Sequence, residues 1–133
     1  MDVYLSEEAF IYLKGQALES SVKNHGGLLI GHKRGQRFFV EKVYPSRESY
    51  ISSERNYWAL DRLFDGKIIG FFSFTSGAEK ALKILQPFAY GKLFLRIALR
   101  PKNRLTLKPY VIEYKDSFFL LPISLHSRPK GKK

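Results

Sequence analysis

The segment 67–74 constrains the fold of this chain more than any other. It reads Lys-Ile-Ile-Gly-Phe-Phe-Ser-Phe, and β-branched and aromatic side chains in succession are typical of a β-strand. We therefore predict the strongest strand of the chain here, with the other elements arranged around it.

Helical and strand patterns lie on both sides of this segment. Ser6 is a suitable N-cap, and Phe10, Leu13 and Ala17 then recur at helical spacing, which predicts a first helix with one buried face. Further helices are predicted at 53–66 and at 77–86, the second ending before a proline. The remaining strands are predicted at 28–31, 37–44, 93–100, 108–114 and 118–124.

The predicted order of elements is α-β-β-α-β-α-β-β-β. Strands mixed with helices and ending in a meander indicate an α+β fold, in which helices pack on a mixed, mainly antiparallel sheet. The length of 133 residues is ordinary for one domain, and we expect that domain to cover residues 1–125. Residues 126–133 are basic and low in complexity, so we expect a disordered tail there.

The composition excludes several classes of protein. The chain has no cysteine, which excludes disulfide scaffolds, thiolate zinc fingers, iron–sulfur clusters and cysteine nucleophiles. No apolar run is long enough to span a bilayer, and the first residues do not follow a signal-peptide pattern. The sequence therefore predicts a soluble protein in the cytoplasm, with no membrane contact.

Positive charge is in large excess. The chain has 23 Lys and Arg against 12 Asp and Glu, a net charge of +11, and such an excess favours polyanionic partners. Four of these charges belong to the tail, which leaves +7 on the rest. A basic cluster is predicted around one strand end and its loop: Arg96, Arg100, Lys102, Arg104 and Lys108. The alternative is a solvated basic surface without a partner.

The residues by themselves show no catalytic arrangement. The histidines, His25, His32 and His126, lack a second histidine or a carboxylate at helical spacing, so we interpret them as loop residues without a ligand role. Glu41 falls in the middle of a predicted strand, where a solvated position is expected. No nucleophile elbow, phosphate loop or dinucleotide fingerprint is present.

Two segments match a known family pattern. Residues 24–31 read Asn-His-Gly-Gly-Leu-Leu-Ile-Gly, and residues 69–76 read Ile-Gly-Phe-Phe-Ser-Phe-Thr-Ser. With the element order and the Tyr-Pro-Ser exit of the strand at 37–44, these segments resemble the JAMM (MPN) metalloprotease family in its short prokaryotic form. The resemblance covers roughly residues 2–125 and implies a fold of the JAMM and cytidine-deaminase type.

The residues that carry catalysis in that family are replaced here. On this alignment Asn24 stands at the catalytic glutamate, Ser73 and Thr75 stand at the two zinc-binding histidines, and Ser76 stands at the proline that follows them. Hydroxyl groups are poor zinc ligands, and an amide cannot act as a general base. The resemblance therefore implies a degenerate site without zinc, and no other cofactor is expected.

Three functions remain open from the sequence. The leading hypothesis is a non-catalytic JAMM-like module that binds a protein, such as another JAMM-like subunit or a ubiquitin-like protein. The alternative is a protein that binds nucleic acid or another polyanion through the basic cluster. The third is a divergent zinc peptidase or isopeptidase acting after a ubiquitin-like or sulfur-carrier tail, its metal site rebuilt from His25 or His32 with Glu41 or Glu79.

Overall fold

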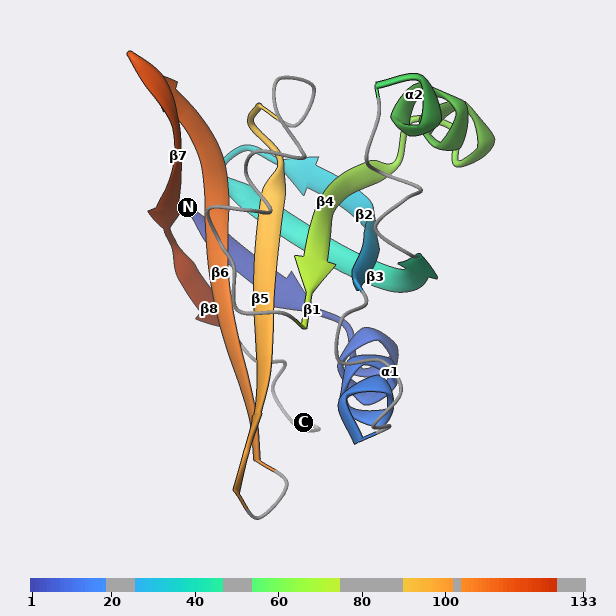
Figure 1. Cartoon of the computed structure of the whole chain (residues 1–133), viewed down its shortest axis with the longest axis vertical. Helices are drawn as coiled ribbons and strands as arrows, with labels where there is room; N and C mark the ends of the chain where they lie inside the picture. Colours follow the sequence, from blue (N-terminus) through green and yellow to red (C-terminus); the bar gives the residue numbers. More distant parts are fainter. Residues whose placement is uncertain (19–25, 47–53, 75–89, 102–103, 127–133) are drawn as a thin grey trace.

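The structure is a computed structural model, and it describes residues 1–18, 26–46, 54–74, 90–101 and 104–126. Figure 1 shows the elements within these residues. In chain order they are β1 (Asp2–Leu5), α1 (Glu7–Leu18), β2 (Gly26–Arg34), β3 (Arg37–Ser46), α2 (Glu54–Leu63), β4 (Ile68–Ser73), β5 (Leu93–Arg100), β6 (Arg104–Lys115), β7 (Ser117–Pro122) and β8 (Ser124–His126).

All these strands belong to one sheet, in the order β7-β6-β5-β4-β2-β3-β1-β8. The two outermost strands, β7 and β8, are consecutive in the chain and are separated by Ile123 alone. The Ile123 amide donates to the Pro109 carbonyl at 3.2 Å. This bond continues the pairing of β7 with β6, and β8 then lies against β6 (Figure 1). The sheet therefore curls until its two edges nearly meet.

The predicted α+β fold with a helix-packed sheet is wrong. The described chain is mainly strand, with two short helices. The predicted order omitted β1 before the first helix and β8 at the end of the last strand. The third predicted helix, at 77–86, lies outside the described residues. A sheet that curls this far encloses much of its core with its own inner face, so it does not need helices along one whole side.

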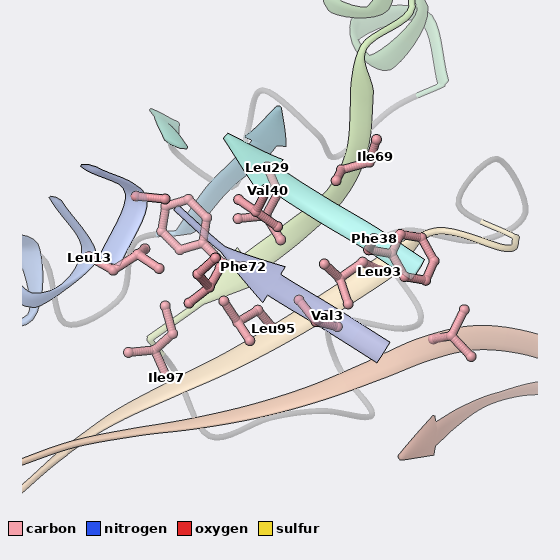
Figure 2. Close-up of a cluster of buried hydrophobic side chains, with 13 residues drawn as sticks. Val3, Leu13, Leu29, Phe38, Val40, Ile69, Phe72, Leu93, Leu95 and Ile97 are labelled. Carbon is pink, nitrogen blue, oxygen red and sulfur yellow. The ribbon is translucent and has the colours of Figure 1, made fainter. Parts of the chain in front are cut away.

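The main core lies on the inner face of the curled sheet. Its side chains come from β1 to β6 and from α1, and Figure 2 shows Leu13 of α1 beside those of the strands. The buried residues of this cluster are Val3, Leu5, Ala9, Leu13, Leu29, Phe38, Val40, Ile69, Phe72, Leu93, Leu95, Ile97 and Val111. A second cluster lies on the outer face of the middle strands and consists of Leu28, Ile68, Phe71, Phe94 and Ile112.

The start of α1 confirms the predicted cap, whereas its buried face differs from the prediction. The Ser6 hydroxyl accepts a hydrogen bond from the Ala9 amide at 3.0 Å and donates one to the Glu41 carbonyl at 2.8 Å. The helix thus begins as predicted and is anchored to β3. Ala9 and Leu13 face the core, while Phe10 is 39% exposed. Neither helix of the described chain is long and apolar enough to cross a membrane.

The strands in the middle of the sheet agree best with the strands predicted from the sequence. The segment predicted as the strongest strand forms β4, and the strand predicted at 93–100 is β5. β4 pairs antiparallel with β2 and parallel with β5, and the side chains of Ile68 to Phe72 are all buried. Core residues on both faces explain why this segment has no polar alternation.

Candidate functional site

The degenerate site predicted from the family resemblance is described only in part. Ser73 is the last residue of β4 and pairs with Gly26 of β2. Asn24, Thr75 and Ser76 lie outside the described residues, as do His25 and Glu79. In the part of the chain that the structure describes, no three His, Asp or Glu side chains are grouped to hold a metal ion.

We expect untagged protein to be purified with far less than one zinc ion per chain. The hydroxyl and amide groups that the resemblance aligns with zinc-ligand and base positions bind zinc weakly, because zinc prefers imidazole, thiolate and carboxylate. Elemental analysis combined with a zinc titration measures this directly. One tightly held zinc per chain would contradict the expectation and would return the peptidase hypothesis to first place.

The predicted basic cluster is brought together by the β5–β6 hairpin. Arg96 pairs with Lys108, and Arg100 pairs with Arg104. We name these four residues the cationic hairpin. The adjacent residues Leu95, Ile97 and Leu107 belong to the inner core, so Arg96 and Lys108 lie on the outer face. Lys102 lies outside the described residues.

The described side chains of the cationic hairpin form no ion pair with another described residue. The ion pairs found there join other residues, and none involves Arg96, Arg104 or Lys108. Like charges directly opposite each other on neighbouring strands destabilise a sheet. In Figure 1 the ends of β5 and β6 that carry Arg100 and Arg104 project beyond the remaining strands. Arg104 and Lys108 are exposed and Arg96 is partly buried, so these three side chains of the cationic hairpin carry positive charge without an ion-pair partner among the described residues.

A row of four stacked rings crosses the outer face of β8, β1, β3 and β2. Tyr4 is paired in register with both His126 and Phe39, and Phe39 with His32. The ring centroids are separated by 5.0 Å from His126 to Tyr4, 5.3 Å from Tyr4 to Phe39 and 4.9 Å from Phe39 to His32, with nearly parallel planes. We name these four residues the ring row.

Each histidine of the ring row contacts a carboxylate. His32 Nδ1 lies 3.0 Å from Glu41 Oε2, and His126 Nε2 lies 3.5 Å from Asp2 Oδ2. Glu41 reaches His32 because of a β-bulge, since Ile30 pairs with Lys42 while the next residue of β2 pairs with Val40. Bulges commonly redirect a side chain in this way. The solvated strand position predicted for Glu41 is confirmed, but its contact with His32 was not predicted.

A shallow depression of about 500 Å³ lies beside the ring row at the β2–β3 turn. Its lining residues are Met1, Asp2, Arg34, Gly35, Gln36, Arg37 and Phe39. Arg34 and Arg37 are directly opposite in register, a further pair of like charges. The Arg37 guanidinium lies 6.0 Å from the centroid of the Tyr4 ring, within the range of a cation–π contact.

Lys92 is a partly buried cation away from this surface. Its Nζ donates to the Ile68 carbonyl at 2.6 Å. Burial lowers the pKa of Lys92, while the charge of Asp61 acts in the opposite direction. Its bond joins the start of β5 to the start of β4, which gives Lys92 a structural role.

Comparisons with known proteins give a fold but no family. No family model matches this chain, and no curated protein matches it either. Among solved structures, it is similar to the solution structure of protein DSY2949 from Desulfitobacterium hafniense. The two chains are 18% identical, the match covers 95% of this chain and 92% of the other, and the TM-score is 0.67. At this level of identity, the likeness bears on the fold alone.

Proposed function

We propose that this protein binds nucleic acid through the phosphate backbone, with the cationic hairpin as its main contact. The observation that carries this proposal is the register of β5 and β6, which sets Arg96 opposite Lys108 and Arg100 opposite Arg104. In the described chain, no carboxylate forms an ion pair with the members of this set whose side chains are described.

The energetics of these pairs support a phosphate ligand. Opposed cations cost stability in the free protein, and a bound phosphate between them removes that repulsion. Residues four apart on a strand are separated by roughly 13 Å. The pair Arg96 and Lys108 and the pair Arg100 and Arg104 are therefore two positively charged positions about that far apart along the hairpin. The net charge of +11 adds long-range attraction to the same ligand.

The other expectations from the sequence stay predictions. A protein-binding module and a zinc peptidase were both inferred from the family resemblance, and the helix-packed fold that went with that resemblance is not the one observed. A cytoplasmic location is compatible with nucleic-acid binding and also stays a prediction.

The test is a charge reversal on the cationic hairpin. We expect wild-type protein to bind a fluorescein-labelled 20-nucleotide oligonucleotide with an affinity that falls linearly on a log–log plot against salt. The double variant Arg104→Glu, Lys108→Glu should bind roughly tenfold or more weakly at low salt, with the slope reduced by about two. Fluorescence anisotropy at several KCl concentrations measures both quantities.

The same variant should not lose stability. Each new glutamate would lie opposite an arginine, so two repulsive cross-strand pairs become attractive, and the thermal midpoint should stay equal or rise. The matched control is Lys14→Glu, Lys115→Glu, which changes the net charge equally at exposed positions on α1 and at the far end of β6. Equal loss of binding in both variants would contradict a defined site. Binding to polyglutamate but to no oligonucleotide would point instead to an acidic protein partner.

A further inference from the structure

We infer that the ring row binds unpaired bases, so that the nucleic acid recognised by this surface is single-stranded. This inference rests on the proposed function and names its ligand more closely. It is carried by the position of the ring row relative to the cationic hairpin and by the two half-exposed imidazoles at its ends, each of which has one stacked ring among the described residues.

The ring row and the cationic hairpin lie on one outer surface. The hydrogen bond from Ile123 to Pro109 aligns β8 with β6, so Ser124 follows next to Lys108. Leu125 packs on the inner core, which places its neighbours Ser124 and His126 on the outside. The ring row thus begins on the strand adjacent to β6 and continues across β1 and β3 to β2.

The core does not account for the position of these rings. The inner-facing residues of β1 and β3 that belong to the buried core are Val3, Leu5, Phe38 and Val40, and neither Tyr4 nor Phe39 belongs to it. Tyr4 and Phe39 alternate with them and point outward, where they are only partly buried. Aromatic rings on the outer face of a sheet, next to arginines, are the usual means of binding unpaired bases.

Among the described residues, the imidazole at each end of the ring row has a stacked ring on one face only. Tyr4 and Phe39 each stack against two rings, whereas His32 and His126 each stack against one in the described chain. Their side chains are 45% and 47% exposed. A base that stacks on either imidazole extends the row by one ring. The carboxylates of Glu41 and Asp2 hold the imidazoles in orientation for that stacking.

The charges around the ring row agree with a single strand. Arg34 and Arg37 lie on one side of the row, and the cationic hairpin lies beyond its His126 end. A single strand can place its phosphates on these cations and turn its bases toward the rings. A duplex keeps both faces of each base stacked inside the helix, so it can use the cations but cannot stack a base on the imidazoles.

The experiment compares three ligands of equal length by fluorescence anisotropy. They are a single-stranded oligonucleotide, an oligonucleotide whose bases are replaced by abasic sites, and a duplex. We expect the single strand to bind roughly tenfold or more tightly than the abasic strand at the same salt concentration, because base stacking on aromatic side chains adds to the backbone contacts. Equal affinity for the single strand and the abasic strand would overturn the inference.

Variants at the ends of the ring row make the test specific. His126→Ala and His32→Ala should each weaken single-strand binding roughly fivefold or more and leave abasic binding unchanged. His126→Gln retains a partner for Asp2 but removes the ring, so it should lose binding equally if stacking is the cause. Tyr90→Ala is the control, since Tyr90 is a 57% exposed aromatic residue outside the row.

Different experimental results would contradict the proposed function and the inference about unpaired bases. If binding depends on salt but the single strand and the abasic strand bind with equal affinity, the cationic hairpin remains the binding site and the ring row is not part of it. Absence of binding to every oligonucleotide would overturn the proposed function, and the inference with it. Tighter binding of the duplex than of the single strand would also overturn the inference.

Discussion

Phe71→Ala and Phe72→Ala should each lower the free energy of unfolding by roughly 3–5 kcal/mol, the usual cost of removing a fully buried phenyl ring. The two residues are adjacent in β4, so their side chains point to opposite faces of the sheet. Phe71 is 0% exposed in the outer cluster, and Phe72 is 2% exposed in the inner core. Both rings are enclosed because β4 is covered on both sides.

The measurement is urea or thermal unfolding of the two variants beside wild type. For a chain of this size, the expected losses correspond to a decrease in the melting temperature of roughly 10–20 °C. Phe119→Ala is the control, because Phe119 lies on the edge strand β7 and is 38% exposed. We expect it to cost roughly 1 kcal/mol or less. A small effect at Phe71 or Phe72 alone would contradict the burial of β4 on both faces.

Elements encoded by local pattern could be predicted from the sequence. The strand at 67–74 and the strand at 93–100 have side chains that favour strands wherever they occur. The N-cap at Ser6 depends on neighbours only a few residues away, and it is present. Such signals specify single elements but not how the elements are arranged.

The error in fold class arose from short elements stabilised by distant partners. β1 has four residues and forms because it pairs in parallel with β3 and with β8 at the far end of the described chain. The curl of the sheet depends on those same pairings. The face of α1 was difficult for a different reason: Phe10, Ile11 and Tyr12 are apolar in succession, so the helix has no clear polar side to indicate its orientation.

The candidate site also has one part that could be predicted from the local sequence and one part that could not. The cationic residues lie close together in the sequence of one hairpin, so their clustering was predictable. That Arg96 lies opposite Lys108 could be known only from the register of β5 and β6. The ring row joins residues 4, 32, 39 and 126, and no short sequence motif contains them all. His32 and His126 were interpreted as loop residues, but they lie in β2 and β8. Only the pairing of four strands brings the rings together.

Gly31→Ala should destabilise the protein by roughly 3 kcal/mol, at the upper end of the usual cost of overpacking. A Cβ atom at Gly31 would overlap the carbonyl oxygen of Phe39 on β3. A backbone oxygen cannot rotate away as a side chain can, so the two strands would have to separate. The Gly31 amide also donates to the Lys67 carbonyl at 3.0 Å, so β2 is held from the other side as well.

The matched control adds the same methyl group where there is room for it. Gly15 lies in α1, and a Cβ atom added there would have no heavy atom within 4 Å from the described residues outside the helix backbone. Gly15→Ala should therefore stabilise the protein by about 0.5–1 kcal/mol, since alanine loses less backbone entropy in a helix. Chemical denaturation of both variants should give changes of opposite sign. A neutral Gly31→Ala would mean that β2 and β3 are farther apart beside His32 and Phe39, and the continuous stacking of the ring row would then be wrong as well.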